Sequence, residues 1–373
     1  MMNIAERVKE YIKRIIILLF PSVVASYIHK NPHIYNSLRI WGGDLLSDMT
    51  EEYINIYLTK EEIIDTSLIS TIKKDILICH FKYGISPIEY FVHDFRYKKE
   101  TLRGTYMSKM LKDKLIMSQL GSLREQAFVE LKDKSQFYNL AKEYFKRDVC
   151  SINGLNDYKN FKSFTKTHSR FIAKPINGRF GKNTNIYDLK DYNNSSKVVF
   201  DILMNIADDW IVEELIVQDA RFSEWNPSSV NTIRIPSFRT ANGIFVFAPF
   251  MRTGRKGSPV DNGGAGGIMV SIDSNNGVIC TNAIDELGHS FILHPDSNKE
   301  FKGWIVPNWD QLLALSAEVH NSLPEYHKYI GFDFALSQDK GWVLVEGNWG
   351  DFICQQATLG RGLKKEFKQL INS

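Results

Sequence analysis

The stretch "GFDFALSQDKGWVLVEGNWG", residues 331–350, has the pattern of one tight β-hairpin. Two apolar, aromatic-rich runs flank the turn-forming residues 338–341, which suit a four-residue loop that ends in glycine. We therefore expect two antiparallel strands in which Ser337 pairs with Trp342.

That register brings three oxygen-bearing side chains together. Asp333 would lie directly opposite Glu346, and the two-residue period of a strand puts Asn348 on the face of Glu346. Two neighbouring carboxylates repel each other and resist joint ionisation, so we expect a positive charge between them. Few oxygen ligands, with coordination left for phosphate oxygens and water, suit Mg2+ better than Zn2+. An ordinary surface hairpin with acidic decoration is the alternative, because exposed carboxylates are common.

The composition is that of a globular chain of two or three domains. Of its 373 residues, 43% are hydrophobic and 24% are charged, and no low-complexity tract or repeat interrupts them. A net charge of +3 is too small to indicate a nucleic-acid partner. The four cysteines form no CxxC pair and fit a reducing compartment, so we expect a cytoplasmic location.

An apolar stretch at residues 11–28 raises the question of a membrane. It carries Lys13 and Arg14, is broken at Pro21 and has six fully apolar residues in a row, fewer than the roughly 20 that a spanning helix needs. The small-residue cleavage motif of a signal peptide does not follow convincingly. We expect a helix that is buried or faces a partner, with peripheral contact to the inner face of the membrane as the alternative.

The rest of the chain divides into a mainly helical N-terminal part and an α+β body. Apolar residues recur at three- and four-residue spacing up to about residue 125. Further helices are predicted near 135–147 and over 309–323. β-hairpins joined by glycine-rich loops are expected in the body. The strand-like runs cover residues 170–176, 210–217, 231–238, 243–251 and 267–273.

The first glycine-rich loop follows a lysine on a predicted strand. Lys174 precedes Gly178 and Gly181, and such a loop lets backbone N–H groups approach phosphate oxygens while the lysine supplies a point charge. The P-loop pattern fails here, because it needs a glycine at Ile176 and a hydroxyl at Asn183. A plain hairpin turn is the alternative.

The second glycine-rich loop is preceded by a group of cations. Arg252, Arg255 and Lys256 come before four glycines, and Arg234 lies on a predicted strand. The GxGxxG spacing breaks at Met269, and a strand follows where a helix should. An anionic group faced by several cations explains the arginines better than a solvated loop does.

A third segment, "DWIVEELIVQD" at 209–219, is an apolar run interrupted by Glu213 and Glu214. As an extended connector, it would offer backbone N–H and C=O groups to an adenine edge and a carboxylate to ribose hydroxyls.

Taken in order, these elements resemble the ATP-grasp superfamily. They are Lys174 with its loop, the connector at 213–218, Arg234, Asp333 and the Glu-Gly-Asn of 346–348. Each element alone is weak, but together they recur in the right sequence at plausible distances.

A narrower resemblance covers roughly residues 127–360. The segments "SVNTIRI", "FMRTGRKGSPVDNGGAGGIMVSID" and "VLVEGNWG" are similar to the sugar-transfer-associated ATP-grasp branch, which is related to α-L-glutamate ligases and found with genes for cell-surface polysaccharides. Asp219 departs from the histidine of many relatives, and His294 matches an "HP" of the branch without an assigned role.

The resemblance implies an α+β ATP-grasp fold, in which two α+β lobes hold ATP between them behind a helical N-terminal region. The expected boundaries are 1–125 for the helical region, 126–212 for the N-lobe and 213–373 for the C-lobe. Residues implied to bind ATP are Lys134, Lys174, Gly178, Gly181, Lys182, Glu213, Glu214 and Ile216. The implied Mg2+ ligands are Asp333, Glu346 and Asn348, and the implied catalytic residues are Arg234, Arg252 and Asn262.

The leading hypothesis for function is an ATP-dependent carboxylate–amine ligase that acts through an acylphosphate. By analogy with the branch, it would join an amino acid to a sugar or sugar acid of a cell-surface polysaccharide. One alternative is a kinase that phosphorylates a small-molecule or glycan hydroxyl. Another is a non-catalytic module that binds nucleotide, or a scaffold that binds a membrane-bound glycosyltransferase complex through the N-terminal helices.

Overall fold

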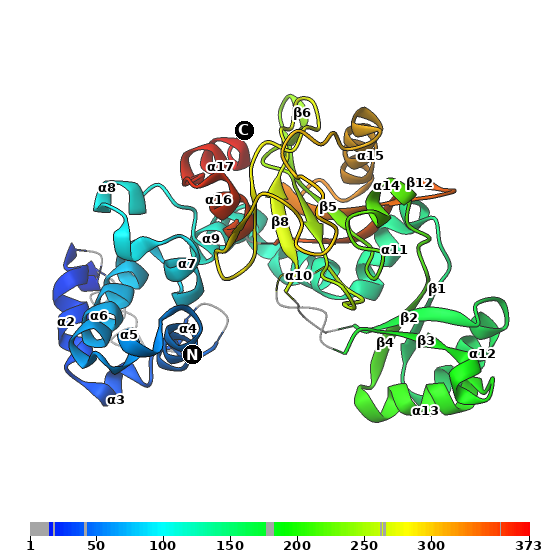
Figure 1. The fold of residues 1–373 in the computed structure, drawn as a ribbon, viewed down its shortest axis with the longest axis horizontal. Helices are drawn as coiled ribbons and strands as arrows, with labels where there is room; N and C mark the ends of the chain where they lie inside the picture. Colours follow the sequence, from blue (N-terminus) through cyan, green and yellow to red (C-terminus); the bar gives the residue numbers. More distant parts are fainter. Residues whose placement is uncertain are drawn as a thin grey trace. The chain divides into compact units, whose positions relative to one another are not determined.

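The computed structural model describes residues 15–17, 19–40, 43–176, 183–261, 263, 266–350 and 352–373. The chain forms two compact units (Figure 1). Unit 1 comprises Met1–Leu115 and Asp351–Gln369, and unit 2 comprises Ile116–Gly350 and Leu370–Ser373. No described helix is both long and apolar enough to cross a lipid bilayer.

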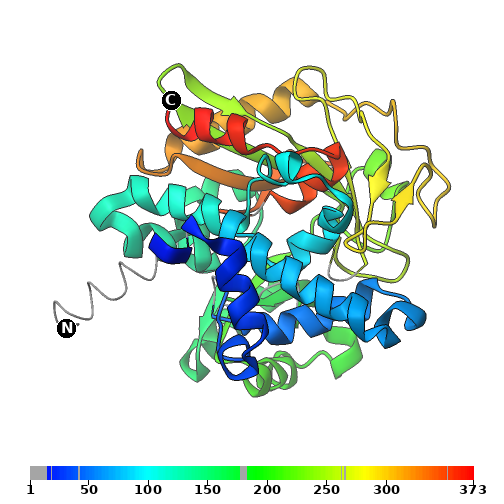
Figure 2. The ribbon, with the colours of Figure 1, turned by 90° about the vertical axis from the view of Figure 1, so that its left-hand side faces the viewer.

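Unit 1 is helical in its described part, as the sequence predicts. Its longest helix, α6 (Thr66–Tyr83), begins at Asp65, whose carboxylate accepts hydrogen bonds from two backbone N–H groups, and ends at Gly84 with a φ of 74°. Helix α2 (Pro21–His29) lies alongside α6 (Figure 2). The other helices are α3 (Pro32–Tyr35), α4 (Leu46–Tyr57), α5 (Lys60–Ile64), α7 (Pro87–Val92), η1 (Phe95–Tyr97), α8 (Glu100–Arg103), α16 (Ile353–Leu359) and most of α17 (Lys364–Ile371).

The C-terminal helices join unit 1 through a buried glutamine. The Gln356 side chain accepts from the N–H groups of Met107 and Leu363 at 2.7 and 3.0 Å, and it donates to the carbonyl of Met107. Three bonds on one buried amide satisfy backbone groups that would otherwise lack partners. The structure thus returns the chain to unit 1 after residue 350.

Unit 2 contains a small antiparallel sheet in the order β1-β4-β2-β3. Its strands are β1 (Val149–Asn153), β4 (Asp209–Glu214), β2 (Arg170–Pro175) and β3 (Asn185–Asp188). Helices α12 (Tyr158–Thr167) and α13 (Ser196–Ile206) cover one face (Figure 1). Trp210 fixes this packing, because its buried indole N–H donates to the Leu203 carbonyl of α13 at 3.0 Å.

A second sheet of eight strands forms the larger part of unit 2. Its order is β10-β9-β8-β7-β5-β11-β12, and β6 pairs with β5. The strands are β5 (Thr232–Thr240), β6 (Gly243–Val246), β7 (Phe250–Thr253), β8 (Ile268–Ser271), β9 (Ala283–Ile284), β10 (Ser290–Phe291), β11 (Tyr329–Ser337) and β12 (Gly341–Asn348).

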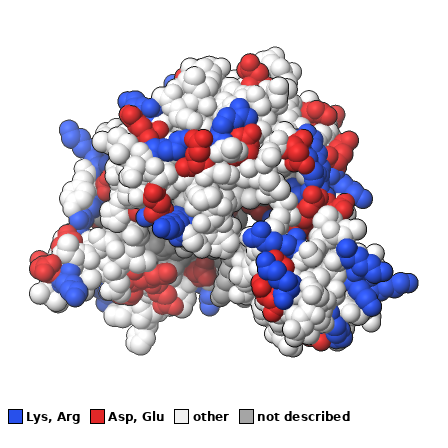
Figure 3. All heavy atoms as spheres, turned by 45° about the vertical axis from the view of Figure 1, so that its right-hand side comes forward, with Lys and Arg blue, Asp and Glu red and all other residues white. Residues whose placement is uncertain are grey.

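Helices α11 (Lys134–Phe145) and α15 (Trp309–Ser322) pack on this sheet and confirm the two helices predicted near those positions. The remaining helices of unit 2 are short: η2 (Gly121–Leu123), α10 (Arg124–Lys132), η3 (Leu155–Asp157), η4 (Leu189–Tyr192) and α14 (Ala220–Ser223). Helix α9 (Lys109–Leu120) spans the boundary at residue 115. Basic and acidic side chains are interspersed on the face shown in Figure 3, in keeping with the small net charge.

The hairpin of β11 and β12 corrects one predicted detail. The predicted pairing of Ser337 with Trp342 is wrong by one residue, because Ser337 pairs with Gly341 and the loop has three residues. A β-bulge beside Asp333 then shifts the register by one, so Asp333 still pairs with Glu346. The bulge thus compensates for the one-residue error at the turn, and the predicted pairing at the site is confirmed.

Candidate active site

Three neighbouring strands of the large sheet carry a row of charged side chains. Arg234 on β5 pairs with Asp333 on β11, which pairs with Glu346 on β12. Cross-strand partners share a sheet face, so the three side chains lie on one side. The residues before and after Arg234, Ile233 and Ile235, point the other way into the apolar core.

Asp333 is the central anion of this row and is bound by two arginines. Arg234 donates to both carboxylate oxygens, with Nη2 to Oδ2 at 2.8 Å, and Nη2 of Arg252 lies 2.7 Å from Oδ2. Burial alone would raise the pKa of Asp333, but Arg234 and then Arg252 outweigh it and lower that pKa to about 2. Two predicted catalytic cations are thus held by a predicted metal ligand.

The geometry of Arg234 requires glycines around it. Gly350 has a φ of +50°, and a Cβ atom there would lie 2.8 Å from Nη1 of Arg234. A Cβ atom on Gly331 would lie 3.2 Å from Cδ of the same arginine. Gly331 and Gly350, at the two ends of the hairpin segment 331–350, therefore make room for the Arg234 side chain. The sequence alone did not indicate this contact.

Glu346 differs from Asp333 in its electrostatic surroundings. Burial raises the pKa of Glu346, and the neighbouring Asp333 raises it further. Asn348 Nδ2 donates to Glu346 Oε1 at 3.0 Å, and Asn348 Oδ1 accepts from Nη1 of Arg234 at 3.2 Å. The three predicted metal ligands therefore lie together, linked through Arg234.

This donor set fits Mg2+ in its chemistry. All three side chains offer oxygen, which Mg2+ prefers, and the soft ligands that zinc favours are not among them. A divalent cation would also relieve the repulsion that raises the pKa of Glu346. Arg234 and Arg252 supply positive charge at Asp333, and the charges of both oppose the rise in the pKa of Glu346.

Asp261 is a buried carboxylate that interacts with Arg252. It was not among the residues predicted from the sequence. Its Oδ2 accepts from the N–H of Thr232 at 2.9 Å and lies 3.7 Å from Nε of Arg252. Thr232 in turn accepts from Nη2 of Arg252 at 3.0 Å. Burial raises the pKa of Asp261, although Arg252 opposes that shift. An aspartate in a glycine-rich loop resembles an ordinary turn residue in sequence, so no local signal marked it.

The small sheet contributes a second ion-pair network. Nζ of Lys174 lies 2.7 Å from Glu213 Oε1, and Nε of Arg147 donates to Glu213 Oε2 at 2.8 Å. Burial would raise the pKa of Glu213, but Arg147 and Lys174 lower it to about 2. Arg147 also donates to the carbonyl of Leu344 on β12 at 2.6 Å, so this residue, also missed, connects the two sheets.

Lys134 joins both networks from the first turn of α11. Its Nζ donates to the carbonyls of Pro175 and Ile176 at 3.2 and 3.1 Å. Burial lowers the pKa of Lys134, Glu346 opposes that shift and Lys174 adds to it. These influences place Lys134 within electrostatic range of both the hairpin and the predicted phosphate lysine.

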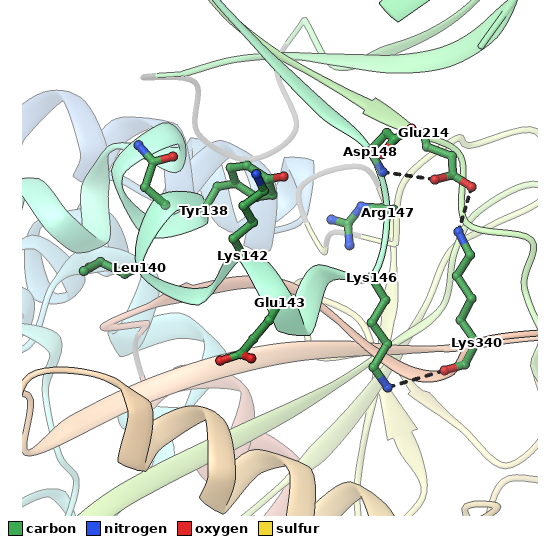
Figure 4. Close-up of a pocket in the computed structure, with 10 residues that line it drawn as sticks. Tyr138, Leu140, Lys142, Glu143, Lys146, Arg147, Asp148, Glu214 and Lys340 are labelled. Atoms are coloured by element: carbon green, nitrogen blue, oxygen red, sulfur yellow. Dashed lines mark hydrogen bonds and ion pairs between the residues drawn. The ribbon is translucent and has the colours of Figure 1, made fainter. Parts of the chain in front are cut away.

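Glu214 lies on the other side of β4 from Glu213. Its Oε1 accepts from Lys340 at 2.7 Å, and its Oε2 accepts from the N–H of Asp148 at 3.0 Å (Figure 4). Alternation along a strand explains why adjacent glutamates reach different partners. Ile216 is half-buried just beyond β4. The predicted residues Gly178, Gly181, Lys182 and Asn262 lie outside the described residues.

A pocket of about 610 Å3 opens beside Glu214 (Figure 4). Of the predicted ATP-binding residues that the structure describes, only Glu214 lines it. Asp148, His168 and Glu214 have ligand atoms within 4.8 Å of one another at this edge, and His168 bonds Asp148 at 2.8 Å. The pocket is therefore distinct from the charged row.

The two residues that departed from the pattern or lacked a role have structural partners. His294 is buried; its Nε2 bonds the Gly254 carbonyl at 3.2 Å and its Nδ1 lies 3.2 Å from the Asp296 N–H. Asp219 caps α14 by accepting from the Arg221 N–H at 2.9 Å.

Unit 2 joins two α+β parts, each with its own sheet and its own charged network, as expected of an ATP-grasp fold. A family model described as sugar-transfer associated ATP-grasp matches residues 105–372. The chain belongs to the sugar-transfer associated ATP-grasp family.

Solved structures with a related fold are distant. One is D-alanyl-alanine synthetase A from Vibrio cholerae O1 biovar eltor str. N16961, with 11% identity and a TM-score of 0.39, covering 65% of each chain. Another is the D-alanine-D-alanine ligase from Coxiella burnetii, with 11% identity and a TM-score of 0.40, covering 71% of this chain and 65% of that one. The ATP-grasp ligase PsnB complexed with minimal precursor has 13% identity and a TM-score of 0.40, covering 72% and 70%. None of the curated proteins matches the chain.

Proposed function

We propose that the protein is an ATP-dependent carboxylate–amine ligase that works through an acylphosphate. The substrates we propose are an amino acid and a sugar or sugar acid of a cell-surface polysaccharide, in keeping with the sugar-transfer association of the family. We place the reaction in the cytoplasm. The observation that carries the proposal is the row of Arg234, Asp333 and Glu346 on one sheet face, with Arg252 bound to Asp333.

We assign the binding of the ATP phosphates to Lys134 and Lys174. Glu213 holds Nζ of Lys174 at 2.7 Å, so this cation is positioned before a phosphate arrives and loses little freedom when one binds. Lys134 has a lowered pKa because of burial, and a phosphate would offset that cost. Gly178, Gly181 and Lys182 remain the predicted lid over the phosphates, and Glu213, Glu214 and Ile216 the predicted adenine and ribose contacts.

Glu346, Asn348 and Asp333 would hold Mg2+. When bound, the ion supplies charge neutralisation at the phosphate oxygens. Glu346 must then be ionised, so the cation would displace the proton that its raised pKa favours and would relieve the repulsion from Asp333.

In the first step, a substrate carboxylate oxygen attacks the γ-phosphorus of ATP. The bond between that phosphorus and the β,γ-bridging oxygen breaks, ADP leaves and an acylphosphate forms. Arg234 and Arg252 neutralise charge on the transferring group, and Asp333 keeps both guanidinium groups in fixed positions.

In the second step, an amine nitrogen attacks the acyl carbon. The carbon–oxygen bond to phosphate breaks, and phosphate leaves with the proton that the amine loses. Arg252 and Asn262 are the proposed donors to the oxyanion of this step. Closure over the nucleotide would keep water from the acylphosphate.

The test uses purified protein, ATP, Mg2+ and panels of amino acids and uronic acids. We expect ADP release that requires a carboxylate, and an amide product that forms only with the amine present. With an 18O-labelled carboxylate, one label should appear in inorganic phosphate, as an acylphosphate requires. ADP release that never depends on a carboxylate would overturn the ligase, and a phosphorylated product without inorganic phosphate would assign a kinase instead.

A further inference from the structure

Unit 1 carries a concentrated apolar surface near its N-terminal end. Five side chains within twelve residues are strongly exposed: Ile16 (47%), Leu19 (66%), Phe20 (56%), Val23 (66%) and Tyr27 (61%). Single exposed apolar residues are common on proteins, but a contiguous group marks an interaction site. We call these five residues the N-terminal apolar surface.

Helix α2 shows that this exposure is one-sided. Its residues Ala25 and Ile28 are buried in the core of unit 1, and Val24 packs against that core. Val23 and Tyr27 lie one turn apart on a different face of the same helix. The folding of unit 1 therefore uses one face of α2 and leaves the other available.

The sequence segment that carries this surface has only positive charges. The sequence has no Asp or Glu between Glu10 and Asp44, whereas the average content of 43 acidic residues in 373 predicts about four in such a span. The same span contains Lys13, Arg14, Lys30 and Arg39. Lys13 and Arg14 lie outside the described residues, so they contribute only through the sequence.

Apolar side chains flanked by cations, without anions, match the chemistry of an anionic bilayer surface. The apolar residues would enter the boundary between headgroups and acyl chains, while the cations would remain among the phosphates. Phe20 and Tyr27 are ring side chains, which suit that boundary. A second copy of the chain fits less well, because a symmetric dimer would place two like-charged surfaces against each other.

We propose that the N-terminal apolar surface docks the protein peripherally on a membrane rich in anionic phospholipid. The inference is independent of the proposed ligase activity. It assigns a membrane surface, rather than a protein partner, to a helix face that the core of unit 1 does not use.

The experiment measures sedimentation of the full chain with vesicles of phosphatidylcholine alone or with 30% phosphatidylglycerol, about the fraction that gives a strongly negative surface. We expect binding to the anionic vesicles that weakens as sodium chloride rises. The variant Leu19→Glu/Val23→Glu should reduce the partition coefficient by about tenfold or more, because it replaces apolar contact with anions. Lys13→Glu/Arg14→Glu should weaken binding and its salt dependence while leaving the apolar residues intact.

The matched control is Leu155→Glu/Ile292→Glu in unit 2, which places the same two charges at side chains that are 72% and 61% exposed. It should bind vesicles as the unaltered protein does. Circular dichroism and light scattering on each variant report folding and oligomeric state. Absence of binding to anionic vesicles at low salt, or equal and salt-independent binding to both vesicle types, would overturn the proposal. A dimer that Leu19→Glu/Val23→Glu abolishes would reassign the surface to a second copy.

Discussion

Glu213 and Glu214 are neighbours on β4, and both are bound by cations, but they differ in solvent exposure. The Glu213 side chain is 4% exposed and is bound by Arg147 and Lys174. Glu214 is 27% exposed and is bound by Lys340, whose own side chain is 33% exposed. One strand thus carries a buried ion-pair network on one side and a solvated ion pair on the other.

The exposure of each ion pair determines how strongly that pair constrains the protein. A buried charge has lost its water, so its partners must replace that solvation, and removing one partner is costly. A half-exposed pair can exchange its partner for water and salt. The Glu213 network therefore fixes the position of Lys174, whereas the Glu214 pair is replaceable.

Removal of Arg147 should have the largest effect on stability. Arg147→Met leaves Glu213 with one cation and leaves the Leu344 carbonyl without this donor, so we expect a loss of about 3–5 kcal/mol in the free energy of unfolding. Chemical denaturation followed by tryptophan fluorescence measures it, because six of the seven tryptophans lie in unit 2. The double variant Arg147→Met/Glu213→Leu should recover part of the loss, and a single variant as stable as the unaltered chain would refute the role of this network.

Glu346 is the carboxylate of the charged row whose pKa is raised rather than lowered. Glu346→Gln should cut ADP release by a factor on the order of 100 to 1,000, because the proposed metal loses a charged ligand. The free energy of unfolding should stay nearly unchanged, since an amide avoids the repulsion from Asp333. Initial rates of ADP release and denaturation curves test the two parts.

The matched control for that experiment is Asp148→Asn, which removes a carboxylate from the exposed cluster beside the pocket. Its ADP release should equal that of the unaltered chain. Undiminished ADP release by Glu346→Gln would contradict the metal assignment.

Decreasing pH should remove the stability that the buried carboxylates of Glu213 and Asp333 contribute. The pKa of Glu213 falls from 4.5 to about 2, so between these values the unfolded chain binds more protons and stability decreases as pH decreases. Asp333 acts in the same direction, because its pKa falls from 3.8 to about 2. Glu346 acts in the opposite direction, because its pKa is raised.

We expect a net loss on the order of 3 kcal/mol between pH 5 and about pH 2.5, measured by denaturation at each pH. In Glu213→Gln the loss over the same range should be smaller, because that variant has no proton to bind at position 213. An equal loss in both proteins would show that other carboxylates dominate the acid response.

The hairpin shows what local pattern can predict. The alternation of apolar and polar residues over 331–350 was sufficient to place Asp333, Glu346 and Asn348 together. Even the error of one residue at Ser337 did no harm, because a bulge restored the register. A bulge has no strong sequence signal, so its position was not predictable.

The contacts of Arg234 and Arg147 could not be predicted from local sequence pattern. Arg234 and Asp333 are 99 residues apart, and their pairing depends on β5 lying beside β11. Arg147 precedes β1 without any motif, and its contacts with Glu213 and Leu344 exist only after the two sheets meet. Strand order is a long-range property that one sequence specifies only weakly. Strands β1, β3, β9 and β10 were missed for a different reason, because short strands carry little periodic signal.

The smallest effect is predicted for Lys340, the partner of Glu214. Lys340→Met should change the free energy of unfolding by about 0–1 kcal/mol, because Glu214 keeps the Asp148 N–H as a donor and remains in contact with solvent. Denaturation at low and high salt measures this, and the small difference between variant and unaltered chain should shrink further as salt screens the pair. A loss comparable to that of Arg147→Met would mean that both sides of β4 are equally constrained, and exposure would then no longer explain why one glutamate fixes its lysine and the other does not.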